Sequence, residues 1–207
     1  MLKYTPFSFL TIICFLADAH LAPGQKSYWQ QEAHYRMKVD LYPEQHRLEG
    51  QQRLRYVNHS PDTLHKVFYH LYFNAFQPGS MMDTRSRNLP DPDGRVEDRI
   101  QKLDSSQIGY QQIQQWKMNG KEVAPKVHGT VLEGKLPEVL LPGDTAVFTL
   151  RFSSQVPVQI RRSGRNNEEG IDYTMTQWYP KMAAYDRLGW HPDPYVAREY
   201  YAPFGSY

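Results

Sequence analysis

Hydrophobic and polar residues alternate with a period of two along much of this chain. In residues 32–41 every second side chain is apolar, and the side chains between them are charged or imidazole groups. The apolar positions of this run are Ala33, Tyr35, Met37, Val39 and Leu41. After a turn at residues 42–46, residues 47–56 repeat the alternation. Since a period of two gives a strand one apolar face, the pattern predicts two half-buried strands that pair antiparallel across the turn.

Three further runs extend this pattern. Residues 64–73 are apolar or aromatic on both faces, which predicts a strand covered on both sides in a packed pair of sheets. Asn119-Gly120 lies between two extended segments, residues 108–118 and 123–132, and predicts a hairpin turn. Residues 146–152 alternate again after a turn. The sequence therefore predicts an all-β fold, a mainly antiparallel β-sandwich or saddle.

Between residues 77 and 106 the alternation stops. Val96, Ile100 and Leu103 have helical spacing, which predicts one short amphipathic helix in a long insertion over the sheet. Residues 161–170 are polar and predict a mobile loop. Asn58-His59-Ser60 is an N-glycosylation sequon, although the proline that follows it makes it a weak one.

The N-terminus has the layout of a secretory signal peptide. Lys3 precedes an apolar run at residues 7–16, and small residues follow it at positions 17, 19 and 22. We therefore expect residues 1–25 to be a signal peptide and linker, and residues 26–207 to be one exported domain, periplasmic or secreted. A retained interfacial anchor is the alternative. The single cysteine, Cys14, lies in the apolar run, so the processed chain would have no disulfide and no thiolate metal ligand.

The net charge of the chain bears on the partners to be expected. The formal net charge is +2, from 24 basic and 22 acidic side chains. This near balance gives no reason to expect a nucleic-acid or anionic-membrane partner. After removal of the leader, no integral membrane segment is expected.

Residues 173–195, YTMTQWYPKMAAYDRLGWHPDPY, are unusually dense in aromatic, amide and basic side chains. In an extended segment, alternation would place Gln177, Tyr179 and Lys181 on one face, where they would offer an amide, a phenol and an ammonium group to a ligand. His191 is the histidine of this stretch and joins the candidate substrate-binding set. The alternative is a structural edge strand that ends at Pro180, with these side chains in water or bonded to neighbouring backbone.

Catalytic motifs are missing from the sequence. It contains no His-Glu-x-x-His, no Gly-x-Ser-x-Gly and no glycine-rich phosphate loop after a strand. His65 and His70 lie five positions apart on a predicted strand, so they point to opposite faces and cannot share a metal ion. We therefore assign no catalytic and no metal-binding residue to this chain, and expect it to be inactive alone.

A set of short segments, in this order along the chain, resembles the N-terminal β-domain of zinc aminopeptidases of the aminopeptidase N and leukotriene hydrolase type, in its exported bacterial branch. The segments are YRMKVDLYPE at 35–44, LEG at 48–50, YVNHS at 56–60, VFYHL at 67–71 and MTQW at 175–178. The resemblance covers nearly all of residues 30–207. It implies a saddle-shaped β-domain that packs against a thermolysin-like catalytic domain and helps to shape its peptide cleft.

The resemblance also implies roles for particular residues. Gln177 matches a family glutamine that lies near the amino end of the bound peptide. The next family position is usually an acid or amide but is Tyr179 here, and a neutral phenol cannot pair with an ammonium group by charge. The family's zinc site lies in a domain that this chain does not include, so zinc is expected there and no cofactor in this chain. The expected partners are that catalytic domain and a peptide substrate, and the chain is expected to be an N-terminal piece, truncated at its C-terminal end.

A second hypothesis belongs to a different class. The chain contains 15 tyrosines and 4 tryptophans, and exposed aromatic rings can stack on a ligand. An independent secreted β-sandwich module that binds carbohydrate or protein therefore remains the alternative function.

Overall fold

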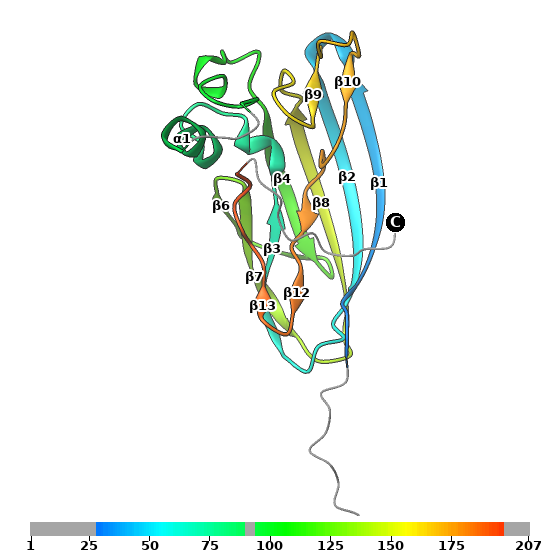
Figure 1. Cartoon of the computed structure of the whole chain (residues 1–207). Helices are drawn as coiled ribbons and strands as arrows, with labels where there is room; N and C mark the ends of the chain where they lie inside the picture. Colours follow the sequence, from blue (N-terminus) through cyan, green and yellow to red (C-terminus); the bar gives the residue numbers. More distant parts are fainter. Residues whose placement is uncertain (1–27, 90–93, 197–207) are drawn as a thin grey trace, which may run out of the picture.

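Two antiparallel sheets pack face to face in the computed structural model, which describes residues 28–89 and 94–196 (Figure 1). The five-stranded sheet has the order β1 (Glu32–Tyr42), β2 (Arg47–Val57), β8 (Thr145–Gln155), β4 (Tyr110–Met118) and β5 (Lys121–Glu122). The four-stranded sheet has the order β11 (Lys181–Met182), β3 (Leu64–His70), β7 (Val131–Leu140) and β6 (Pro125–His128). The predicted all-β, mainly antiparallel fold is confirmed.

The first two strands pair as the alternation predicts. Glu32 lies opposite Val57 at one end of the ladder, and Tyr42 lies opposite Arg47 at the other. The turn between them is a 3-10 helix, Pro43–Gln45, and His46 closes it in the left-handed region with φ 52°. β8 then pairs with β2 along its whole length, so three strands of 11 residues each form the centre and one edge of the sheet.

The main core lies between the two sheets and is rich in aromatic rings. Trp116 is 1% exposed and meets Tyr69 edge to face, with ring centroids 5.3 Å apart. Two glycines make room for these rings. A Cβ on Gly134 would lie 2.3 Å from the Trp116 ring, and a Cβ on Gly50 would lie 2.2 Å from the ring of Phe152. Glycine at these positions therefore sets how closely the aromatic side chains approach the strands.

Two strand predictions need correction. The predicted strand 64–73 ends at His70, and the chain continues as a 3-10 helix, Tyr72–Ala75. The predicted strand 123–132 is divided between β6 and β7, because Gly129 has φ 58° and turns the chain back on itself. The hairpin predicted at Asn119-Gly120 is confirmed, since β4 and β5 pair across it and both residues have positive φ.

One short α-helix in the insertion is confirmed, but its predicted place at residues 96–103 is wrong. In the described part of the chain the α-helix is α1, Met81–Asn88, and Ile100–Lys102 form only a 3-10 helix. Ser80 caps α1 by accepting a hydrogen bond from the Asp83 backbone N–H at 3.1 Å, a cap that the helical-spacing argument overlooked. Val96 and Ile100 are nevertheless fully buried. They join a second, smaller core under α1, which also contains Tyr72, Ala75, Phe76, Met82, Ile160 and Tyr195.

The segment 161–170 is more ordered than a polar loop. Within it, β9 (Gly164–Arg165) pairs with β10 (Tyr173–Thr174). Arg165 is 6% exposed, and its guanidinium donates to the Val156 and Ser106 carbonyl groups. Buried carbonyl oxygens require donors, and this arginine supplies them.

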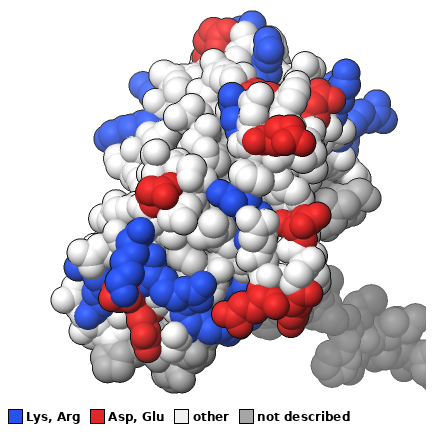
Figure 2. Space-filling view, turned by 90° about the horizontal axis from the view of Figure 1, so that it is seen from above, with Lys and Arg blue, Asp and Glu red and all other residues white. Residues whose placement is uncertain are grey.

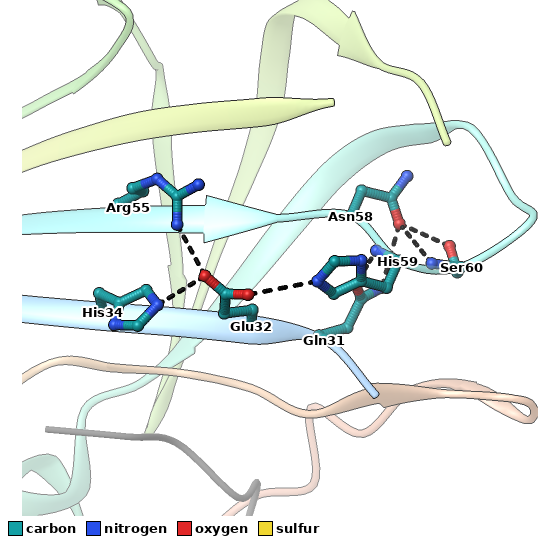
Figure 3. A network of polar contacts seen from close by, with 7 residues as sticks. All are labelled: Gln31, Glu32, His34, Arg55, Asn58, His59 and Ser60. Atoms are coloured by element: carbon teal, nitrogen blue, oxygen red, sulfur yellow. Dashed lines mark hydrogen bonds and ion pairs between the residues drawn. The ribbon is translucent and has the colours of Figure 1, made fainter. Parts of the chain in front are cut away.

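The turn after β2 is organised by a buried asparagine. Asn58 is 0% exposed and donates its side-chain amide to the carbonyl oxygens of Asp62, Leu140 and Leu141. Gln31 donates to its side-chain oxygen (Figure 3). Asn58 is therefore a structural residue, and its burial leaves the sequon inaccessible to a glycan.

The predicted signal peptide at residues 1–25 lies outside the described residues. Among the residues that are described, no helix is long and apolar enough to span a membrane.

Candidate functional site

The stretch 173–195 runs from the two-stranded sheet of β9 and β10 to the four-stranded sheet (Figure 1). It begins in β10 and adds β11 to the edge of the four-stranded sheet, where Lys181 lies opposite His70 and Met182 opposite Tyr69. It then forms a small hairpin of β12 (Tyr185–Asp186) and β13 (Gly189–Trp190). Each of its strands is only two residues long, so most of the stretch depends on other contacts to fix its backbone.

Three side chains of the five-stranded sheet hold the backbone of residues 178–182. Gln111 donates to the Trp178 carbonyl oxygen at 2.7 Å, and Gln52 donates to the Pro180 carbonyl oxygen at 2.8 Å. The Met182 N–H donates to the Tyr35 hydroxyl at 3.0 Å. Both glutamines are 3% exposed on the apolar face of their strands. Their polarity there is explained, because each satisfies a carbonyl group that the short strands leave without a ladder partner.

The expected extended conformation of residues 176–181 is wrong. Gln177 has φ 54°, in the left-handed region, which interrupts any alternation of faces. Tyr179 is 8% exposed, and its ring packs against Tyr35 and Trp178 with centroids 5.6 Å and 5.2 Å away. Gln177, Tyr179 and Lys181 therefore do not form one ligand-facing row. Substrate binding by these residues stays a prediction.

Gln177 is half-buried beside the segment that contains β9. The preceding residue, Thr176, donates its hydroxyl to the Arg162 carbonyl oxygen and its N–H to the Ser163 hydroxyl. The Gln177 amide itself makes no hydrogen bond to any described residue, so its donor and acceptor are available to a ligand.

Lys181 and His191 lie at the edge of the four-stranded sheet. The His191 N–H donates to the Ala184 carbonyl oxygen, and its Nε2 lies 2.9 Å from the Asp186 carboxylate. Both side chains of this contact are partly accessible, with side-chain exposures of 20% for His191 and 30% for Asp186. Lys181 is half-buried opposite His70.

His70 lies opposite Lys181 in the strand pair β3–β11. It is 3% exposed and stacks on Tyr72, with ring centroids 5.2 Å apart and an interplanar angle of 19°. Burial lowers its pKa from 6.5 to about 4, and the charge of Lys181 adds to this effect while Asp193 opposes it. His70 is therefore a neutral imidazole at pH 7. We call His70, Lys181, Asp186, His191 and Asp193 the edge cluster.

Sequence reasoning included Lys181 and His191 in the site but missed His70, Asp186 and Asp193. The signal that would have found His70 is the pairing of β11 with β3, and nothing in a two-residue strand predicts its register. His65 is exposed and His70 is buried, and a register irregularity between Leu64 and Lys66 interrupts the strict alternation from which opposite faces are predicted for the two histidines. Gln177 is not part of the edge cluster.

No group of three or more His, Cys, Asp or Glu side chains is arranged to hold a metal ion within residues 28–89 and 94–196. A network elsewhere, at the start of β1, combines Glu32 with two histidines and an arginine (Figure 3). Arg55 lies 2.7 Å from the Glu32 carboxylate and places a positive charge where a cation would bind. This network is an ion-pair cluster rather than a metal site.

The aromatic side chains contribute mainly to packing. Trp116 is buried, and Trp29, Trp178 and Trp190 are half-buried. The Trp190 ring lies between Tyr56, Phe68 and Tyr185, with centroid distances of 5.0–6.4 Å. The tryptophans of the described residues thus offer no fully exposed platform for stacking on a sugar, whereas among the tyrosines Tyr28 is 85% exposed and Tyr42 is 45% exposed.

Charged side chains of both signs are distributed over the end of the molecule that carries β9 and β10 (Figure 2). Basic side chains gather toward the left of this view, the side on which Figure 1 places α1. Acidic side chains lie beside them, so this end is of mixed charge.

No family model matches the chain, and no curated protein matches it in sequence. Among solved structures, the chain is similar to an M1 zinc metallopeptidase from Deinococcus radiodurans, with 16% identity, a TM-score of 0.43, and coverage of 72% of this chain and 26% of that chain. A variant of that enzyme bound to a Tyr-Ser-Ala substrate gives 17% identity, a TM-score of 0.42 and coverage of 72% and 26%.

A two-domain M1 zinc metallopeptidase variant bound to L-tryptophan gives 17% identity, a TM-score of 0.42 and coverage of 72% and 27%. This chain therefore spans about a quarter of the length of these solved structures. The likeness concerns part of the fold alone.

Proposed function

We propose that this chain is the non-catalytic N-terminal β-domain of an exported zinc metallopeptidase of the aminopeptidase type, and that it helps to shape the peptide cleft of a catalytic domain. The ordered set of segments in residues 35–178 supports this proposal, because such a series is more specific than any one of its motifs. Residues 26–207 would form the domain, and residues 1–25 would direct it to the periplasm or out of the cell.

One observation carries the role in the cleft. The backbone of residues 178–182 is fixed by Gln52, Gln111 and Tyr35, while the side-chain amide of Gln177, just before this fixed part, makes no hydrogen bond to any residue that the structure describes. Because the backbone next to Gln177 is held in this way, it has little conformational freedom to lose when the side chain binds a ligand. Gln177 could therefore donate to a peptide carbonyl group or accept from its amino end.

The other predicted residues take different roles in this proposal. Tyr179, which packs in the core, would position the segment rather than touch the peptide. Lys181 and His191, in the edge cluster, would line the rim of the cleft or contact the catalytic domain. The neutral His70 beneath them would support their backbone by packing.

Zinc would be held outside this chain. The described residues offer no suitable set of ligands. The catalytic domain of the family supplies a zinc ion that polarises the scissile carbonyl group and activates water. This chain would contribute only positioning, and misplacement of a substrate by about 1 Å can reduce the rate on the order of a hundredfold.

The test begins with the reading frame that encodes this chain. If a His-Glu-x-x-His follows in frame, the longer protein should release amino acids from chromogenic amides, lose this activity with a chelator and regain it with zinc. Gln177→Ala should then lower kcat/KM by about tenfold to a hundredfold. The matched control is Gln114→Ala, an exposed glutamine on the far face of the five-stranded sheet, which should leave kcat/KM unchanged.

Two results would count against the proposal. A reading frame that encodes no metallopeptidase domain would contradict the proposal that this chain is part of such an enzyme. Equal kcat/KM for Gln177→Ala and the unaltered enzyme would remove Gln177 from the cleft.

A further inference from the structure

The outer face of the five-stranded sheet carries a group of basic side chains that the proposed function does not use. Strand register places Arg36 of β1 directly opposite Arg53 of β2. Two residues further along, Lys38 lies opposite Gln51, which in turn lies opposite Arg151 of β8. We call Arg36, Lys38, Arg53 and Arg151 the basic patch; all four are exposed.

An open groove lies over this patch. Its volume is about 470 Å³, and the four basic side chains line it together with polar residues from β2, β4 and β8. The polar ones are Gln51, Gln115 and Thr149. The lining residues come from β1, β2, β8 and β4, which are adjacent strands (Figure 1), so the groove extends across the sheet from its β1 edge inward.

The patch differs from the other basic residues on the same face. Arg47 pairs with Glu49 at 2.6 Å, Arg55 with Glu32 at 2.7 Å, and Lys117 with Glu122 at 3.1 Å. Across residues 28–89 and 94–196, by contrast, no carboxylate lies within 4.0 Å of a basic group of the patch. The nearest acidic row of the sheet pairs Asp40 with Glu49, and Glu49 already accepts from Arg47.

This arrangement has an electrostatic cost. Like charges directly opposite each other on neighbouring strands are destabilising, and a face that serves solubility alone would alternate signs, as the flanking rows do. Arg36 and Arg53 face each other with no intervening acid. An anionic ligand would remove this repulsion and would gain charge-assisted hydrogen bonds from the arginines.

We propose that the basic patch is a docking site for an acidic polypeptide segment that binds in an extended conformation. Carboxylates at alternate positions of an extended chain lie about 6.7 Å apart, which matches the spacing of Arg36 and Lys38 along β1. Gln51 and Gln115 can donate to and accept from a peptide backbone. Among the described residues no aromatic side chain lines the groove for stacking on a sugar, so the chemistry favours a peptide over an acidic glycan.

This site is separate from the proposed cleft and does not depend on the proposed function. The test measures binding of the 207-residue chain to a fluorescent peptide of alternating glutamate and serine, by anisotropy at low salt. A peptide with glutamine in place of glutamate is the ligand control. We expect the glutamate peptide to bind, the glutamine peptide not to bind, and added salt to weaken binding.

The variant Arg36→Gln/Arg53→Gln should weaken binding of the glutamate peptide about tenfold. Its control is Lys126→Gln/Lys135→Gln, which removes the same charge from exposed positions of β6 and β7 and should leave the affinity unchanged. Circular dichroism of both variants verifies folding. Arg151→Gln provides a second test on a different strand, with a smaller loss.

Three outcomes would overturn the proposal. The first is absence of binding to the glutamate peptide, and the second is an equal loss in both double variants, which would indicate net charge alone. The third is binding of a sulfated glycan or of vesicles with anionic lipid that depends on Arg36 and Arg53 while the peptide does not bind. That result would assign the patch to a different ligand.

Discussion

The five-stranded sheet and the stretch 173–195 are stabilised in different ways. In the sheet, β1, β2 and β8 each contribute 11 residues, and their ladders satisfy the backbone donors and acceptors of one another. In the stretch 173–195, strands are two residues long, and Gln52, Gln111 and Tyr35 of the sheet supply the missing hydrogen bonds. The stretch therefore depends on the sheet, whereas the long ladders are formed by the sheet's own strands.

The difference explains where polar residues are buried. Gln52 and Gln111 would be poor choices on an apolar strand face if that face met only other side chains. Each of these glutamines donates to one carbonyl oxygen of the stretch, at Pro180 and Trp178 respectively. Side chains of the sheet therefore help to fix the conformation of a segment that lies far away in sequence. Substitutions in the two regions should consequently differ in how they destabilise the fold as well as in how much.

The largest effect is expected at His70, where the stretch meets the four-stranded sheet. Burial holds its pKa at about 4, against 6.5 for the exposed side chain. Between these values the unfolded chain binds a proton that the folded chain does not, so stability falls as the pH decreases from 6.5 to 4. The loss should reach about 3 kcal/mol. Urea unfolding at pH 7 and at pH 4 measures it.

The matched variants for this prediction are His70→Phe and His65→Phe. His70→Phe retains a ring for stacking on Tyr72 and removes the titration, so the pH dependence should become shallower. His65 is exposed near the start of β3, and its substitution should leave the pH dependence of stability unchanged. If the stability of His70→Phe and of the unaltered chain depended equally on pH, His70 would not be the group responsible for the loss of stability.

A smaller loss is expected in the sheet itself for Gly50→Ala. The new methyl group would lie 2.2 Å from the buried ring of Phe152, so the ring or the strand must move. We expect destabilisation by about 2 kcal/mol, in the range typical of overpacked cores. Urea unfolding measures it, and Thr145→Ala at the exposed start of β8 is the control. Unchanged stability of Gly50→Ala would contradict the prediction and would mean that the Phe152 ring can move to another rotamer without cost.

Gln52→Met tests the link between the two regions. Methionine has a similar volume but cannot donate to the Pro180 carbonyl oxygen, which would be left without its partner. The expected cost is about 1 kcal/mol. Hydrogen exchange should locate the change, since the Met182 N–H should lose protection while the β2–β8 ladder keeps it. Gln51→Met, on the outer face of the same strand, should change neither the stability nor the protection of the Met182 N–H. A uniform loss of protection across the sheet would indicate that the stretch is not a dependent unit.

The smallest effect is expected at the exposed network around Glu32. Hydrogen bonds from His34, Arg55 and His59 lower the pKa of this carboxyl group from 4.5 to about 2. The contribution to stability is present above pH 4.5 and is lost as the pH falls toward 2, and solvent screening keeps it small. A carbon NMR titration of Glu32 should show the low pKa, and His34→Gln should raise it. A pKa near 4.5 in the unaltered chain would exclude the network in solution.

Sequence reasoning succeeded where a residue's surroundings are set by its neighbours along the chain. The alternation in residues 32–41 and 47–56 gave β1 and β2, and Asn119-Gly120 gave the hairpin between β4 and β5. It failed at α1, where the helix is marked by the Ser80 cap and not by apolar spacing, while the helical spacing of residues 96–103 goes with only a 3-10 helix at Ile100–Lys102. It also failed at Gln177, whose left-handed backbone breaks the assumed alternation of faces.

The sequence by itself determined the all-β class and the two long hairpin strands, because a period of two can be read locally. Only the tertiary structure decided that Tyr179 packs in the core, that His70 lies beneath Lys181, and that Arg36 and Arg53 share an unpaired basic patch. These features depend on strand register and on contacts between residues more than 100 positions apart in some cases, as for Gln52 and Pro180. The free energy of such contacts belongs to the pair and not to either local segment.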